Sequence, residues 1–179
     1  DGVTTNPSLI AREKGDALMA GGNLPAGVTP ALLERSRDFL HRPGISVIED
    51  ASIAVQAGEV HAMHDPTEGG LATGLWELAE AGDVGVVVEE DSIPIFEETA
   101  VLCQALKLDP LGLIASGALL LAVADNDADH VQEALEEAGI AAAHIGRVVE
   151  RKEGKVLRSA AGQRPLPTFE RDEIAQLFE

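Results

Sequence analysis

Hydrophobic residues recur at helical spacing in several stretches of the chain, and each stretch is bounded by residues that start or stop helices. Leu33, Phe39 and Leu40 follow Thr29, which is placed to act as an N-cap, and the pattern stops near Pro43. The same spacing predicts further helices over residues 45–57, 71–81, 97–106, 131–138 and 174–178. Gly58 and Gly139 follow two of them, as expected of residues that end helices.

Shorter apolar stretches lie between these helices and have the spacing of strands. Val84, Val86 and Val88 alternate, whereas residues 118–124 form the continuous apolar run of a strand buried on both faces. Residues 60–63, 145–149 and 155–157 give further strands, and residues 111–115 a short helical turn. Because strands alternate with helices, we expect an α/β (α+β) sandwich in which helices cover a mixed sheet.

The domain organisation follows from shifts in composition along the chain. Residues 1–30 are rich in Gly, Pro, Asn and Thr, and we interpret them as a linker from a preceding N-terminal domain. Residues 31–158 form the domain itself, and residues 159–179 form a C-terminal loop, with two prolines, and a helix. Since the chain begins with Asp1 and shows no signal peptide, we expect it to be a segment of a longer protein.

Charge and cysteine content restrict the partners and the compartment. The 179 residues carry 13 basic and 31 acidic side chains, so the net charge is −18 and the chain repels nucleic acids and anionic membranes. The single cysteine, Cys103, excludes an internal disulfide and is expected to be a small core residue. No apolar stretch reaches the roughly 18 residues of a membrane span. We therefore expect a cytoplasmic protein with no nucleic acid or membrane partner.

The most informative motif is the stretch from His64 to Leu71, His-Asp-Pro-Thr-Glu-Gly-Gly-Leu, which joins a strand to an amphipathic helix. Glycine allows close approach, and the N–H groups at a helix start favour an anion such as phosphate. Alternatively, Asp65 and Glu68 form a capping box that only stabilises the helix. Two glycines in the first turns of a purely structural helix would each cost up to about 1 kcal/mol relative to alanine, which favours a ligand-binding loop.

At these residues the chain resembles a known family. The segment at residues 63–72 is similar to the Asp-Pro-Thr-Arg-Gly-Gly-Leu motif of the hydrogenase-maturation carbamoyl dehydratases, called HypE, of the AIR synthase-related (PurM-like) superfamily. Further matches follow in the same order at Ile93-Pro94, at Leu108-Asp109-Pro110-Leu111, at Ile114-Ala115-Ser116-Gly117 and at Ile145-Gly146-Arg147-Val148. The resemblance covers residues 45–149.

The resemblance implies a C-terminal domain with a partly ferredoxin-like topology, preceded by an N-terminal domain through which two chains form a homodimer. ATP and Mg²⁺ would lie mainly on that N-terminal domain, while the glycine loop closes over phosphates or a small-molecule substrate. The chemistry implied is phosphate transfer in a ligase or dehydratase type of enzyme, which depends on positioning and charge neutralisation. Catalytic residues are not assigned, and this chain alone is expected to be inactive.

The residues expected to contact substrate or phosphate lie in two segments. They are His64, Asp65, Thr67, Glu68, Gly69, Gly70, Ser116 and Gly117. A bulky residue at position 70 is expected to abolish activity of the whole protein without affecting its fold. His61 and His64 are three residues apart on a strand and so point to opposite faces, which argues against a metal site.

Two departures from the family pattern keep other functions open. Glu68 stands where the dehydratase motif has arginine, and the chain ends at Leu177-Phe178-Glu179 where the dehydratase ends in a cysteine. The first departure leaves open a non-catalytic binding or regulatory relative of the same fold.

A second resemblance lies at the start of the chain. Residues 1–10 are similar to the first-strand motif of small transaldolases, which leaves part of a transaldolase-related fusion as a less favoured alternative. The transaldolase barrel needs more than about 200 residues, and no lysine of this chain lies in an apolar strand.

Overall fold

The structure is a computed structural model that describes residues 7–20 and 24–178. Its helices are α1 (Ser8–Glu13), α2 (Gly15–Ala20), α3 (Pro30–Asp38), α4 (Ile48–Ala57), α5 (Gly70–Ala81), α6 (Glu97–Leu106) and α7 (Ala128–Glu137). Its strands are β1 (Val60–His64), β2 (Gly85–Glu89), β3 (Leu120–Val123), β4 (Gly146–Val149), β5 (Lys155–Ser159) and β6 (Gly162–Pro165). Short 3-10 turns include Pro110–Gly112 and Glu173–Phe178.

The strands form two sheets. Strands β1 and β3 pair antiparallel, with Val60 opposite Val123 and His64 opposite Leu120. The other sheet has the order β4-β2-β5-β6, in which β2 runs parallel to β5 and the remaining pairs are antiparallel. The expected α/β class with mixed strand directions is thus confirmed, although the strands divide between two sheets.

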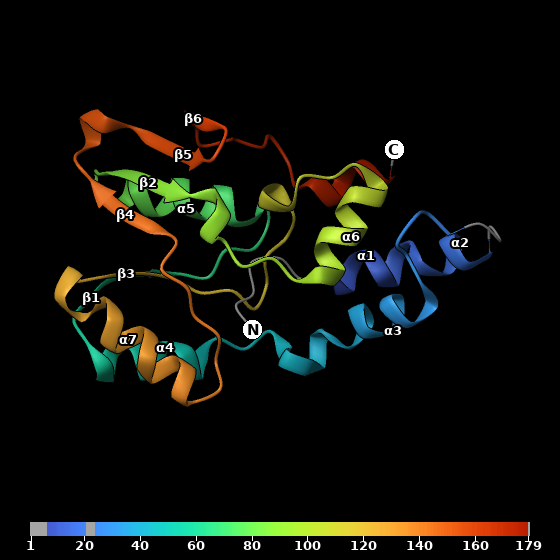
Figure 1. Cartoon of the computed structure of the whole chain (residues 1–179), viewed down its shortest axis with the longest axis horizontal. Helices are drawn as coiled ribbons and strands as arrows, with labels where there is room; N and C mark the ends of the chain where they lie inside the picture. Colours follow the sequence, from blue (N-terminus) through green and yellow to red (C-terminus); the bar gives the residue numbers. More distant parts are fainter. Residues whose placement is uncertain (1–6, 21–23, 179) are drawn as a thin grey trace.

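The helices form three groups, two of which pack beside the sheets (Figure 1). Helix α5 packs beside the β4-β2-β5-β6 sheet, α4 and α7 lie together below the β1-β3 pair, and α1, α2, α3 and α6 gather at the opposite end. The C-terminal 3-10 helix, Glu173–Phe178, lies beside α6 in the same view. This helix therefore packs with α1, the first described helix, because Ile174 and Ile10 belong to the same hydrophobic cluster.

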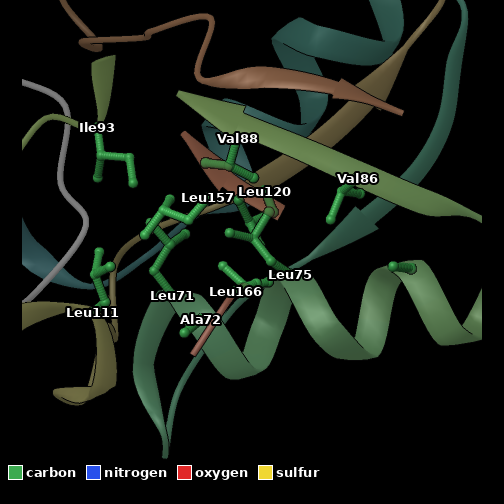
Figure 2. Packing of buried hydrophobic residues seen from close by; sticks show 11 residues of the cluster. Leu71, Ala72, Leu75, Val86, Val88, Ile93, Leu111, Leu120, Leu157 and Leu166 are labelled. Carbon is green, nitrogen blue, oxygen red and sulfur yellow. The ribbon is translucent and has the colours of Figure 1, made fainter. Parts of the chain in front are cut away.

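The largest hydrophobic cluster lies between α5 and the four-stranded sheet. Figure 2 shows Leu71, Ala72 and Leu75 of α5 close to Val86, Val88 and Leu157, with Leu120 entering from β3 and Leu111 from the 3-10 turn. Leu71 and Leu157 are essentially inaccessible to solvent. This packing fixes the start of α5, and hence the glycine loop, against the sheet and the Pro110–Gly112 turn.

A second cluster joins the beginning of the chain to α3 and α6. Ile10 and Ala11 of α1 are fully buried and pack with Leu33, Leu102 and Leu113. The segment interpreted as a linker thus carries two helices and contributes to the core. Its connection to a preceding domain stays a prediction.

Two strands differ from their sequence patterns. Val87 of β2 is buried like Val86 and Val88, although alternation predicts an exposed face. In β3, by contrast, Leu120 is buried and the following residues to Val123 are half-buried, because β3 belongs to a two-stranded sheet that shields it incompletely. The fully buried strand of the fold is therefore β2 rather than β3.

Residues 1–6 of the transaldolase-like motif lie outside the described residues. Residues 8–10 form the first turn of α1, whereas that resemblance predicts a strand. Ile10 there packs as part of a helix in the second cluster.

Candidate functional site

The glycine loop connects the end of β1 to the start of α5, and its two glycines adopt left-handed backbone angles. Gly69 has a φ of 75° and Gly70 a φ of 67°. Residues with a Cβ atom rarely adopt such left-handed backbone angles. Both glycines are buried, whereas Asp65, Thr67 and Glu68 are exposed. The loop thus combines a buried backbone with exposed polar side chains.

Gly70 is needed for the fold as well as for any ligand. A Cβ atom at this position would lie 2.5 Å from the carbonyl oxygen of Leu113 and 2.6 Å from that of Leu111. Its own N–H donates to the carbonyl oxygen of Thr67 at 3.1 Å, closing a turn. The expectation that a bulky residue here spares the fold is therefore wrong, since backbone atoms fill the space that a side chain needs.

Thr67 links the loop to the second predicted segment. Its carbonyl oxygen also accepts a hydrogen bond from the N–H of Ala115, at 3.2 Å. Ala115 directly precedes Ser116 and Gly117, so two segments far apart in the sequence meet at this bond. A Cβ atom on Gly117, where φ is 97°, would lie 2.9 Å from the carbonyl oxygen of Gly44.

A cavity of about 480 Å³ lies next to both segments. Leu71, which follows the glycine loop, and Gly117 both line it. Glu49 and Asp50 supply acidic groups at its wall, and much of the remaining lining is apolar. This cavity has room for a small molecule beside the loop.

His64, the last residue of β1, contacts two carboxylates at the start of the glycine loop. Its Nε2 atom lies 2.6 Å from Oε2 of Glu77 on α5, and its Nδ1 atom lies 4.0 Å from Oδ1 of Asp65. The ring rests over Gly74, where a Cβ atom would approach Cδ2 of His64 to 3.5 Å. The Glu77 contact therefore fixes the ring against the first turns of α5.

The two histidines of β1 have separate partners. His61 lies 3.9 Å from Glu59, away from the Glu77 contact of His64. Across residues 7–20 and 24–178, no group of three or more His, Cys, Asp or Glu side chains is arranged to hold a metal ion.

A carboxylate from the C-terminal part of the chain contacts the glycine loop, and it belongs to Asp172, a residue that the sequence patterns did not single out. Its Oδ2 atom accepts a hydrogen bond from the N–H of Gly69 at 2.8 Å. Its Oδ1 atom accepts from the N–H of Ile174 at 2.9 Å and so caps the C-terminal 3-10 helix. Capping was visible in the sequence as an acidic residue before a helix, but the contact with Gly69 spans 103 residues and has no local signal.

The same C-terminal helix contacts the Pro110–Gly112 turn through Glu173. Oε2 of Glu173 accepts from the N–H of Asp109 at 2.8 Å, and Oδ1 of Asp109 accepts from the N–H of Leu111 at 2.9 Å. A second cavity, of about 470 Å³, is lined here by Glu90, Ile95, Lys107, Leu108, Asp109, Pro110, Leu111 and Glu173. The chain end thus lies along the turn that packs on Gly70.

None of the described helices is both long enough and apolar enough to cross a membrane.

Comparison with known proteins places the chain in a family. The model of the family described as AIR synthase related protein, C-terminal domain, matches residues 13–158. The chain therefore belongs to this family.

Curated relatives are proteins of hydrogenase maturation. A putative hydrogenase expression/formation protein of Methanocaldococcus jannaschii is 34% identical over 161 residues, covering 85% of this chain and 48% of that protein. The carbamoyl dehydratase HypE of Bradyrhizobium diazoefficiens is 39% identical over 162 residues, covering 83% of this chain and 46% of that protein. The chain thus spans about half the length of these relatives.

Solved structures confirm the PurM-like fold. The hydrogenase maturation protein HypE in complex with ATP superposes with a TM-score of 0.66 at 26% identity, covering 96% of this chain and 50% of that chain. A thiamine-monophosphate kinase from Stenotrophomonas maltophilia superposes with a TM-score of 0.58 at 20% identity, covering 90% of this chain and 48% of that chain. The second likeness concerns the fold alone.

Proposed function

We propose that this chain is the C-terminal half of an ATP-dependent enzyme whose glycine loop closes over nucleotide phosphates or substrate. ATP would be held mainly by an N-terminal domain of the same protein. The family match and the HypE structure solved with ATP support the use of this nucleotide. The chain spans about half the length of its relatives, which supports a site shared between two domains.

The observation that carries the proposal is the hydrogen bond between the Gly69 N–H and a carboxylate oxygen, at 2.8 Å. An N–H group at the start of a helix of 12 residues, with the positive end of the helix dipole behind it, favours a negatively charged acceptor. The described loop therefore already presents a donor to an anionic oxygen. A phosphate oxygen has the same hydrogen-bonding requirement.

Charge explains why this half alone would bind nucleotide weakly. Asp65, Glu68 and Asp172 surround the loop, and these carboxylates repel a triphosphate. Cations from elsewhere must then neutralise the phosphates, and Mg²⁺ together with the N-terminal domain would supply them. The residues assigned to the substrate or phosphate side are His64, Asp65, Thr67, Glu68, Gly69, Gly70, Ser116 and Gly117.

The remaining parts of the proposal concern the whole protein. It would act as a cytoplasmic homodimer on a small molecule, by phosphate transfer to an amide or acid oxygen. The cavity of about 480 Å³ beside Leu71 and Gly117 offers space for part of such a substrate. The net charge of −18 argues against a nucleic acid as partner.

A non-catalytic relative that only binds or regulates is the second candidate, and Glu68 is the observation that favours it. Its side chain is exposed on the loop and adds negative charge where phosphate would approach. Glu68 does not cover the Gly69 amide, however, because Asp172 occupies that position. The carboxylate at the Gly69 amide thus comes from the C-terminal part of the chain and not from the loop itself.

Calorimetric titration with ATP and Mg²⁺ tests whether the ATP site is shared between this chain and the N-terminal domain. The 179-residue chain should show no micromolar binding, whereas the whole protein that contains it should bind ATP and turn it over. In the whole protein, Glu68→Arg should tighten ATP binding several-fold, because a cation replaces an anion beside the phosphates. Glu133→Gln, at an exposed position on α7, serves as the control and should change nothing.

Two results would contradict the proposal in different ways. Micromolar ATP binding by the 179-residue chain would show a self-contained site. A whole protein that neither binds nor hydrolyses ATP would favour the non-catalytic relative.

A further inference from the structure

The last described residues of the chain are attached to the glycine loop and to the neighbouring turn by two carboxylates. Asp172 accepts from the Gly69 N–H and Glu173 accepts from the Asp109 N–H, each at 2.8 Å. Between these anchors and the helical end of the molecule, Ile174 inserts into the second cluster and is 8% exposed. We call residues 172–178 the C-terminal strap.

We propose that the C-terminal strap is an autoinhibitory element that holds its own carboxylate where the glycine loop would accept an anionic ligand. Ligand and strap then compete for the loop, and the strap must move away before a phosphate can reach Gly69. The inference rests on the proposed function, since it assumes that the loop accepts an anion. It adds that access to the loop is controlled by the chain itself.

Competition follows from the geometry at Gly69. This N–H has one proton to donate, and Oδ2 of Asp172 already accepts it at 2.8 Å. The neighbouring donor, the N–H of Gly70, is used within the loop by the carbonyl oxygen of Thr67. A phosphate oxygen at Gly69 would also lie beside the negatively charged Asp172, so both groups cannot be accommodated together.

The strap has the properties of an element that can detach at moderate cost. It is a 3-10 helix of six residues preceded by its cap, and such short helices have poor hydrogen-bond geometry. Ile174 is its buried side chain, whereas Phe178 is 61% exposed and contacts Lys14, whose Nζ atom lies 5.3 Å from the ring centroid. Segments with few buried contacts near a chain end open more readily than the core.

A titration with pyrophosphate at constant ionic strength tests the inference. The amide resonances of Gly69 and Ile174 are followed by NMR in the wild-type 179-residue chain and in three variants. Asp172→Asn removes the charge at the loop, and Glu173→Gln weakens the second anchor without touching Gly69. Asp129→Asn, at an exposed position on α7, removes an equal charge away from the strap.

If the strap competes, Asp172→Asn should lower the pyrophosphate concentration at half-saturation by about tenfold, as expected when a closed state populated at about 10:1 is released. Glu173→Gln should lower it in the same direction and by less, because a looser strap leaves the loop more often. Asp129→Asn should stay within about twofold of the wild type. In both strap variants, hydrogen exchange at Ile174 should also become faster.

Other outcomes separate this inference from the proposed function. Equal pyrophosphate affinities of the wild type and Asp172→Asn would show that the C-terminal strap does not compete with the anion. This result would overturn the inference but would leave the loop as an anion site. If Ile174 exchanges faster but no variant binds pyrophosphate, the inference fails, whereas the proposed function is decided separately by ATP binding to the whole protein. Unchanged exchange at Ile174 in both strap variants would show that the carboxylates do not hold the strap, and this also overturns the inference.

Discussion

A Cβ atom on Gly70 would lie 2.5 Å from the carbonyl oxygen of Leu113, so the start of α5 and the segment after the Pro110–Gly112 turn meet backbone to backbone. Real Cβ atoms do not approach other atoms this closely, and a carbonyl of a buried segment cannot swing aside as a flexible side chain can. The position of the glycine loop therefore depends on the absence of a side chain at residue 70. This contact also ties the candidate site to Leu113 of the second cluster.

We predict that Gly70→Ala lowers the free energy of unfolding by about 2–4 kcal/mol, because it adds left-handed strain to a clash with backbone. Gly139→Ala is the matched control, since Gly139 has a similar φ of 78° but no atom within 4 Å of the added Cβ. It should cost about 1–2 kcal/mol from strain alone. Urea unfolding measures both, and equal losses would contradict the backbone contact.

Leu113 is predicted to be essential for stability because it is fully buried beside Leu33 and Leu102. Leu113→Ala should lower the free energy of unfolding by about 2–5 kcal/mol, through lost burial and the cavity left behind. Val55→Ala on the exposed face of α4 should change it by less than about 0.5 kcal/mol. Comparable effects of the two substitutions in chemical denaturation would argue against this packing.

Cys103 is predicted to be unreactive in the folded chain. Burial raises the pKa of its thiol to about 12, and the nearby charges of Asp109 and Glu173 act in the same direction. A thiol reagent at pH 8 should therefore label the folded chain at least about 10³-fold more slowly than the chain unfolded in urea, because thiolate is the reactive form. Rapid labelling in the absence of denaturant would show that α6 does not shield the thiol as described.

Glu80 gives a prediction for the dependence of stability on pH. A hydrogen bond from Lys155, the charge of Lys155 and the nearby Arg151 hold the pKa of this carboxyl below its usual value. Since the folded chain favours the ionised form, the contribution to stability is present above the unfolded pKa and lost as pH falls through the folded pKa. Glu80→Gln should accordingly lower the thermal midpoint at pH 7.

The difference between Glu80→Gln and the wild type should disappear at pH values below the folded pKa of Glu80. Lys155 contributes through a second contact as well, because its Nζ atom lies 4.2 Å from the centroid of the Trp76 ring. Glu133→Gln is the control and should leave the thermal midpoint unchanged at both pH values. A difference between Glu80→Gln and the wild type that stays constant as Glu80 becomes protonated at acid pH would contradict the ion pair as its cause.

Elements with strong local signals could be predicted from the sequence. The Thr29 side chain accepts from the N–H of Leu32 at 3.1 Å, as the N-cap pattern indicated, and α6 spans the predicted residues 97–106. Strand β6 was predicted as a loop, because its residues are polar and exposed and it pairs with β5 alone. The last helix is a 3-10 helix, in which residues three apart align, so Ile174 is buried while Phe178 is exposed.

The candidate site was predictable in part, because some of its residues also carry local sequence signals. The glycines and their helix are neighbours in the sequence, and the family resemblance added the Ser116 segment, which joins the loop through the bond between Thr67 and Ala115. Asp172 could not be predicted, since its contact with Gly69 depends on the path of the chain through β5, β6 and the loop that follows. The roles of these residues in binding stay a proposal.

The sequence by itself determined what depends on near neighbours: helix positions, caps, the glycine loop, the strong negative charge and, through ordered motifs, the family. These features depend on local hydrogen bonds and on periodic burial, which involve residues close together in the sequence. The tertiary structure alone decided which acceptor the Gly69 amide meets, which strand is fully buried and why Gly70 admits no side chain. Those properties arise where segments distant in the sequence pack together, and no local pattern encodes the partner.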